Sequence, residues 1–283
     1  MTLSEDEVER NRIVVLKEMF AALARNHGTL PETYVCIDIE TSGMNTRHDH
    51  ILQIGHCLVV NRKVEDRQAI FLDWSKSMDR TEMTKDELAA LESRTKETVK
   101  RIREKGKACH TDWDRLLTEG QDPYTTLRDY AKFVLELKAD KAFMVMHNGY
   151  HFDCRFLSTA FSKYAGDLAP KFSLPVFIGP TGTDYWAMDS FWFPDNSVLD
   201  TGVLLKAAQI NYVPKPNETL RSFATRVCRI PRKGVFWSLN EYAVPHFGLD
   251  KKYNLSAEKA HDAGYDSYCC HLLLEELRER ANQ

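Results

Sequence analysis

Three strand-like segments follow one another near the start of the chain, and the short links between them restrict how they pair. They span residues 34–40, 51–60 and 68–74 and are rich in β-branched and aromatic side chains. A parallel connection needs a crossover of about a dozen residues or more, and the links here are shorter and polar. The sequence therefore predicts an antiparallel meander.

The remainder of the chain alternates between helical and strand-like patterns. Strands are expected at 142–146 and 198–201. Helices are expected at 82–107, 125–137, 153–164, 202–209, 218–229, 238–247 and 262–281. A meander followed by alternating elements predicts one α/β domain. Its mixed central sheet begins as an antiparallel meander, continues with parallel strands and is flanked by helices.

Length and composition allow a full hydrophobic core, since the chain has 283 residues of which 43% are hydrophobic. Residues 4–26 carry a helical stripe behind a capping box of Ser4 and Glu7, and Gly28 ends it. We therefore expect residues 1–28 to form an appended helix and 29–283 the main domain. Gly, Pro and aromatic residues between 165 and 196 predict a long loop there.

The net charge of −3 gives no global sign of a polyanionic partner, so any nucleic-acid surface must be a local basic patch. Two segments offer one. Residues 94–107 hold seven basic and two acidic side chains, and residues 219–240 hold several arginines and no acid. Each could follow a phosphate backbone, although a charge run is more often a solvated face. The second segment is slightly favoured because it precedes the residue 261 loop.

The cysteine pattern and the first residues bear on the compartment. Seven scattered cysteines show neither a C-x-x-C pair nor zinc-ligand spacing, which favours a reducing compartment. The acidic start does not resemble a secretory signal, and the chain has no apolar run long enough to span a bilayer. We expect no membrane association and a location in the cytoplasm or another reducing intracellular compartment.

Two carboxylates close the first strand. Asp38 and Glu40 are two residues apart, so their side chains leave the same face of the strand. Two such groups aimed at one spot repel each other unless a cation lies between them. The alternative, a solvated polar strand face, is weakened because residues 34–37 have the pattern of a buried strand.

Three more candidates lie where loops meet helices. Asp153 stands where a loop enters a helix, so it could be an N-cap as well as a metal ligand. Asp266 falls in the first turns of the last helix, where the helix dipole favours an acid. His261 lies on the preceding loop and could act as a general base, or it could simply be an exposed histidine.

The three motifs together resemble the DEDD superfamily of 3′→5′ exonucleases, in its histidine subgroup. The family pattern D-x-E-T is matched by Asp38, Glu40 and Thr41. The second motif is matched by His147-Asn148 and by Asp153 through Leu157, and H-x-A-x-x-D by His261, Ala263 and Asp266. The tyrosine subgroup is disfavoured because Asp262 stands four residues before the last aspartate. The segment 75–107 is longer than usual for the family and is expected to be a helical insertion.

This resemblance implies a ribonuclease-H-like fold and a two-metal mechanism. Two divalent cations, Mg²⁺ or Mn²⁺, would be held by Asp38, Glu40, Asp153 and Asp266. His261 would take a proton from the attacking water, and Thr41 and Asn148 would bind the substrate. That substrate would be a nucleic acid with a free 3′ end, single-stranded, hydrolysed to nucleoside 5′-monophosphates. Many relatives are dimers, so a homodimer is also an expectation.

Two alternatives remain open at this point. The chain could be a catalytically silent nucleic-acid-binding module on the same fold, although four converging acids without metal would be destabilising. It could also be an unrelated α/β protein that matches the motifs by chance. The sequence does not choose between DNA and RNA.

Overall fold

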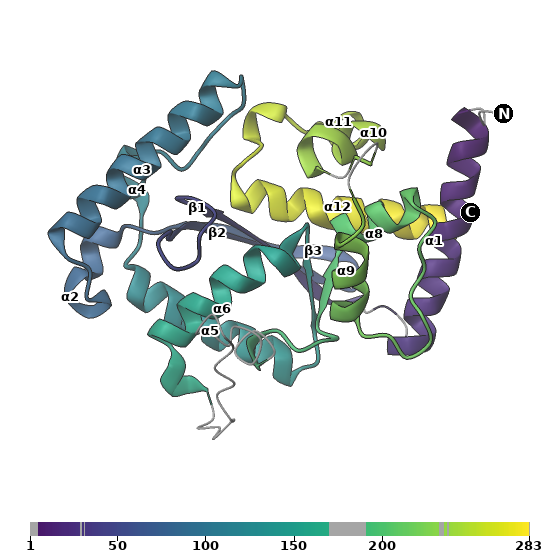
Figure 1. The fold of residues 1–283 in the computed structure, drawn as a ribbon, viewed down its shortest axis with the longest axis horizontal. Helices are drawn as coiled ribbons and strands as arrows, with labels where there is room; N and C mark the ends of the chain where they lie inside the picture. Colours follow the sequence, from purple (N-terminus) through teal and green to yellow (C-terminus); the bar gives the residue numbers. More distant parts are fainter. Residues whose placement is uncertain are drawn as a thin grey trace.

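The fold is built around one mixed sheet (Figure 1). The computed structural model describes residues 5–28, 30, 32–169, 191–231, 235–236 and 238–282, with the side chains of 5–10 left aside. Five strands in this part of the chain are ordered β3-β2-β1-β4-β5. They are β1 (Tyr34–Thr41), β2 (Ile51–Val60), β3 (Lys63–Phe71), β4 (Phe143–Met146) and β5 (Val198–Asp200).

Strand directions confirm the predicted mixed sheet. The pairs β1–β2 and β2–β3 are antiparallel, whereas β1–β4 and β4–β5 are parallel. In the first pair Asp38 lies opposite Gly55, so both face the same side of the sheet. The expected α/β class, an antiparallel meander followed by parallel strands with flanking helices, is what the structure contains.

The third strand was expected at 68–74, but it runs from Lys63 to Phe71. A two-residue turn at Asn61 and Arg62, both with positive φ, returns the chain at once into pairing with β2. The first half of β3 is polar and mostly exposed at the sheet edge, so no apolar alternation marked it as a strand. The chain leaves the sheet after Phe71, and Trp74 begins a 3₁₀ turn.

In the described part of the chain the helices follow the expected order, with three short additions. They are α1 (Glu5–His27), α2 (Met78–Thr81), α3 (Lys85–Glu104), α4 (Trp113–Glu119), α5 (Pro123–Ala139), α6 (Asp153–Tyr164), α8 (Thr201–Gln209), α9 (Leu220–Cys228), α10 (Val244–His246), α11 (Leu249–Lys252) and α12 (Ala263–Ala281). The short helices α2, α4 and α11 were not predicted individually. The helix expected at 238–247 begins as a π-helical turn, Leu239–Ala243, before α10.

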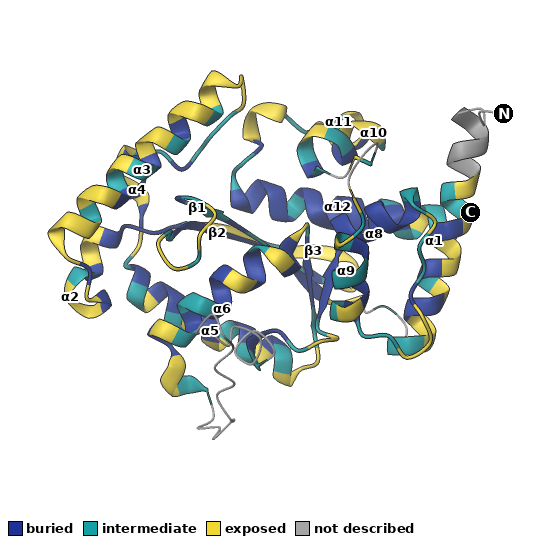
Figure 2. Ribbon diagram, in the orientation of Figure 1, coloured by how far each residue is buried: buried dark blue, intermediate teal, exposed yellow. Residues whose placement is uncertain are grey.

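Helices cover both faces of the sheet (Figure 1). On one face α12 packs along β1, β2 and β3, and a ring contact joins Tyr34 of β1 to His271 of α12. On the other face His56 of β2 contacts the rings of Tyr130 and Phe133 in α5. Burial is densest where the strands meet these helices (Figure 2). The position of α12 matters most, because its first turn carries one of the candidate acids.

The first helix packs against α12 and α8. Its inward stripe includes Met19 and Leu23, both fully buried, and the chain leaves it at Gly28 with φ +82°. Ser4, the predicted cap of this helix, lies outside the described residues. Most of the expected long loop, residues 170–190, also lies outside them. Among the described residues, no helix is long and apolar enough to cross a membrane.

Candidate active site

The start of α6 is tied to the acidic end of β1. Asp38 and Glu40 leave the α12 side of the strand, and the amide of Ile39 between them donates to Asp153 Oδ1 at 3.0 Å. Asp153 is the first residue of α6 and is only 3% exposed. The Asp153 carboxylate is therefore held by a backbone hydrogen bond beside Asp38 and Glu40, which are more than one hundred residues earlier in the sequence.

Asp266 is held from two directions in the first turns of α12. Its Oδ1 accepts from Asn240 Nδ2 at 2.7 Å, and its Oδ2 accepts from the backbone amide of His261 at 3.2 Å. His261 itself has a left-handed backbone, φ +63°, which is uncommon outside glycine. The His261 Nδ1 lies 3.9 Å from Glu40 Oε1. Ligand atoms of Glu40, His261 and Asp266 all lie within 4.8 Å of one another.

A close approach between backbones places the beginning of α12. A Cβ on Gly55 would lie 2.0 Å from the carbonyl carbon of Ala263, so only glycine fits opposite Asp38. Gln53 of β2 completes the contact, because its Nε2 donates to Asp262 Oδ2 and its Oε1 accepts from the Ala263 amide. Asp262 caps α12 by accepting from the amide of Tyr265.

We name Asp38, Glu40, Asp153 and Asp266 the acidic cluster. Burial raises the pKa of Asp38 and Glu40 well above the usual carboxyl range, and the negative charges of the other members raise it further. Burial also raises the pKa of Asp153 and of Asp266 to about 7, against hydrogen bonds from backbone amides and from Asn240. The repulsion acting on Asp38 and Glu40 agrees with the contacts above, which bring the four carboxylates together where ionisation of all of them is unfavourable.

His261 has the opposite shift. Burial lowers its pKa below 6.5, and the positive charge of Lys107 lowers it further. His110 adds a smaller effect in the same direction, while the carboxylate of Glu241 opposes it. Lys107 and Glu241 form an ion pair beside this loop. A neutral imidazole near neutral pH is the form in which histidine accepts a proton.

The donor set suits hard divalent cations. Four carboxylates supply oxygen atoms, the ligand type that Mg²⁺ prefers and that Mn²⁺ accepts, and one imidazole lies beside them. A cation among these groups would offset the repulsion that raises their pKa values. The residues present therefore fit the ions that the sequence motifs imply.

Each of the two expected substrate residues lies close in sequence to a member of the acidic cluster. Thr41 ends β1 next to Glu40, and its hydroxyl donates to the Gly43 carbonyl. Asn148 is exposed, has φ +66°, and donates its amide to Asp200 Oδ1 at 2.8 Å. Asp200 also caps α8 by accepting from the amide of Val203.

Three contributors were missed by the sequence argument. Asn240 had no local signal, because it lies in a segment that simply appeared helical. Gln53 was marked by being polar within an apolar strand, and Gly55 by being a glycine in the same strand. Two arginines of the 219–240 segment form ion pairs within the described residues, Arg221 with Asp195 and Arg226 with Glu218.

Comparisons with known proteins give partial likenesses. No family model matches the chain. A stretch of 132 residues is 29% identical to "DNA polymerase III PolC-type" of Mycoplasma genitalium, which is 47% of this chain and 7% of that protein.

Among solved structures, exonuclease I of E. coli in complex with a dT13 oligonucleotide gives a TM-score of 0.48 at 14% identity. It covers 88% of this chain and 42% of that one. Another structure of exonuclease I gives a TM-score of 0.49 at 14% identity, over 88% and 41% of the two chains. The chain thus spans less than half the length of each of these proteins, and these likenesses do not assign it to a family.

Proposed function

We propose that the protein is a metal-dependent 3′→5′ exonuclease of the DEDD superfamily, in the histidine subgroup, that releases nucleoside 5′-monophosphates. The observation that carries the proposal is the convergence of the acidic cluster from β1, α6 and α12: the Ile39 amide between Asp38 and Glu40 donates to Asp153, and ligand atoms of Glu40, His261 and Asp266 lie within 4.8 Å of one another. Burial raises the pKa of all four carboxyls, and repulsion by the other members raises the pKa of Asp38 and Glu40 further. Carboxylates in that arrangement are costly unless cations bind between them. Strongly perturbed acids next to a histidine are typical of catalytic sites.

In this proposal each group of residues has a separate role. The acidic cluster would hold two divalent cations, and His261 would take the proton of the attacking water at one ring nitrogen. When bound, such cations lower the pKa of water and neutralise charge on the phosphate and the leaving oxygen. Asn240 would keep Asp266 oriented through the hydrogen bond to Oδ1. The distance of 3.9 Å between His261 Nδ1 and Glu40 Oε1 supports a base at the edge of the proposed cation site.

The substrate in this proposal is a single-stranded nucleic acid with a free 3′ end. Thr41 and the exposed Asn148 would contact the terminal nucleotide, because Thr41 ends β1 next to Glu40 and Asn148 lies in the link between β4 and Asp153 at the start of α6. The partial sequence match to a DNA polymerase of the PolC type is in keeping with a role on nucleic acid. DNA and RNA are separate arms of the test, and a homodimer stays a prediction.

The test uses single-stranded DNA and RNA labelled at the 5′ end, with Mn²⁺ or Mg²⁺ or with chelator. We expect a ladder that shortens from the 3′ end, release of 5′-monophosphates, and loss of both with chelator or in Asp38→Ala. The exposed Asp129→Ala is the matched control, since Asp129 only pairs with Lys132 at the surface. Equal activity in Asp38→Ala and the parent, or none in the parent on either polymer, would contradict the proposal.

Metal binding is followed separately by thermal unfolding. An ion that binds only the folded protein at about one hundred times its dissociation constant adds about 2.7 kcal/mol of stability. We expect Mn²⁺ to raise the melting temperature of the parent and of Asp129→Ala, but not of Asp38→Ala. Stabilisation without any hydrolysis would instead favour the silent binding module.

A further inference from the structure

The helix α3 packs against the loop that follows the β1 carboxylates. The sequence resemblance identified this helix only as part of an insertion. Thr98 Oγ1 donates to the carbonyl of Ser42 at 3.3 Å, and Arg94 Nη2 donates to that of His48 at 2.9 Å. Both acceptors lie in the loop that follows Glu40 and Thr41. One side of α3 is thus fixed against the loop that leaves the acidic cluster.

The C-terminal end of α3 lies near the segment that holds Asp266. Lys107, just beyond the helix, pairs with Glu241, which is the neighbour of the Asn240 that holds Asp266. The charge of Lys107 also acts on His261. In Figure 1 the free end of α3 accordingly points towards the loop that joins α11 to α12. A nucleic-acid strand that left the acidic cluster between the Thr98 contact and the Lys107 ion pair would pass along α3.

Arg101 and Lys105 lie between the two contacts on the docked side of the helix. Together with Thr98, they fall within an arc of about 60°, because α-helical residues advance about 100° each. Both are exposed. Glu97, at 3.9 Å, is the acid nearest to Arg101, and both side chains are more than half exposed, so this ion pair neutralises little.

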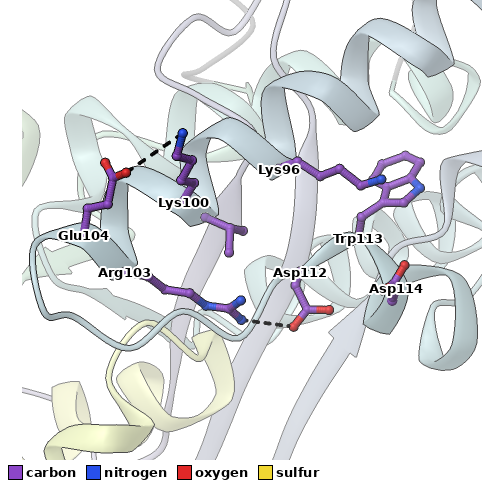
Figure 3. Close-up of a pocket in the computed structure, with 8 residues that line it drawn as sticks. Lys96, Lys100, Arg103, Glu104, Asp112, Trp113 and Asp114 are labelled. Carbon is purple, nitrogen blue, oxygen red and sulfur yellow. Dashed lines mark hydrogen bonds and ion pairs between the residues drawn. The ribbon is translucent and has the colours of Figure 1, made fainter.

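The far side of α3 has a different charge balance. There a cavity between α3 and α4 is lined by Lys96, Lys100 and Arg103 together with three acids (Figure 3). Arg103 contacts Asp112, and Lys100 faces Glu104. Three bases and three acids line that cavity, whereas on the docked side Arg101 makes the exposed pair with Glu97 and Lys105 has no ion pair among the described residues.

From this placement we infer that Arg101 and Lys105 form a phosphate-binding face for the nucleic-acid strand upstream of the 3′ end. The charge of this face identifies its ligand as the phosphate backbone of a nucleic acid. The whole chain has a net charge of −3, yet positive charge is locally in excess next to the proposed cleavage site. The inference rests on the proposed function and extends it, because the face would determine how strand length affects affinity rather than the chemistry itself.

The experiment compares Arg101→Gln/Lys105→Gln with Lys96→Gln/Lys100→Gln, an equal loss of charge on the far side of the same helix. Binding of a labelled single strand of about 20 nucleotides is measured against salt, in the Asp38→Ala background and in the Asp38-containing protein with chelator. For the first variant we expect about tenfold weaker binding at about 0.1 M salt, and a log–log salt slope smaller by about 1.4, that is 0.7 for each lost contact. The far-side variant should keep the parental slope.

Turnover separates this inference from the proposed function. We expect kcat/KM of the Arg101→Gln/Lys105→Gln protein to fall about tenfold more on the long strand than on a trinucleotide, which has too few phosphates to reach the face. Equal losses on the two substrates, or equal effects of the two variants, would overturn the inference while leaving the nuclease intact. Charge-dependent binding without hydrolysis in the Asp38-containing protein would support the face and reject the nuclease. Absence of both binding and hydrolysis would reject both.

Discussion

At the residue scale, the structure brings together the acidic cluster and His261, which the sequence singled out, while their roles as metal ligands and general base remain predictions. Their residue types and spacing within each motif are local, and each motif adjoins a recognisable strand or helix end. The supporting residues are not local. Asn240 reaches Asp266 across 26 positions and Gln53 reaches Asp262 across 209, so only the folded chain reveals them. The roles of Thr41 and Asn148 in substrate binding remain predictions.

The proton-accepting role of His261 is tested through its neighbour Lys107. We expect His261→Ala to lower kcat by about 10²–10⁴-fold, the usual contribution of a positioned general base. In the parent, kcat/KM should rise with pH as the imidazole loses its proton, through a pKa below 6.5. Lys107→Ala removes a charge that disfavours the imidazolium, so the pKa should rise and the acid limb should move to higher pH.

The control for that profile is Lys141→Ala, which removes an exposed lysine from the turn before β4. Its acid limb should coincide with that of the parent. An acid limb that stays in place in Lys107→Ala, or that moves to lower pH, would show that His261 is not the group being titrated.

At the element scale, periodicity predicted the helices and the interior strands, because their buried faces repeat regularly. It failed for the start of β3, where Lys63, Glu65 and Arg67 lie on an exposed edge and show no apolar alternation. It also failed for α4, which is seven residues long and has only a few buried side chains. Neither failure affects the site, which is assembled from β1, β2, α6 and α12.

The contact between β2 and the start of α12 is tested by Gly55→Ala. The added methyl group cannot be accommodated next to the Ala263 carbonyl, so α12 must shift and take Asp266 and His261 with it. We expect a loss of about 1–3 kcal/mol in the free energy of unfolding, typical of overpacking, and a marked fall in Mn²⁺-dependent hydrolysis.

Gly166→Ala provides the comparison, since a Cβ there meets nothing within 4 Å and φ is not positive. Denaturant unfolding and turnover of this variant should match the parent. If Gly55→Ala behaved in the same way, the close approach would have no part in placing the site.

Helix α1 is tested by Met19→Ala. Met19 is fully buried where α1 packs on α12 and α8, so truncation should cost about 2–5 kcal/mol. Val14→Ala, on the same helix but 52% exposed, should change stability by less than about 0.5 kcal/mol. Urea unfolding measures both. A small effect of Met19→Ala would mean that α1 contributes little to the stability of the main domain.

At the scale of the whole molecule, the acidic cluster makes stability depend on pH. Asp153 and Asp266 have pKa values of about 7 in the folded protein, against about 3.9 in an unfolded chain. Between these values the folded protein binds more protons, so this contribution to stability is complete below about pH 4 and is lost as the pH rises through 7. Bound cations would reverse the trend by favouring the ionised carboxylates.

Asp153→Asn isolates this effect in metal-free protein. The amide keeps an acceptor for the Ile39 N–H but removes one negative charge, so we expect a gain of about 1–3 kcal/mol at pH 8 and little change at pH 4. Thermal unfolding at both pH values, with chelator present and Asp129→Asn as control, measures it. A variant that is less stable than the parent at pH 8 would contradict the account of repulsion within the cluster.

The hydrogen bond from Ile39 to Asp153 has a consequence for how ions would enter. The donor belongs to the peptide between Asp38 and Glu40, so movement of the α6 terminus is mechanically coupled to both strand carboxylates. A cation that draws Asp153 towards Asp38 would thereby preset Glu40 for its companion. We therefore expect occupancy to be cooperative, with a titration curve steeper than that of two independent sites.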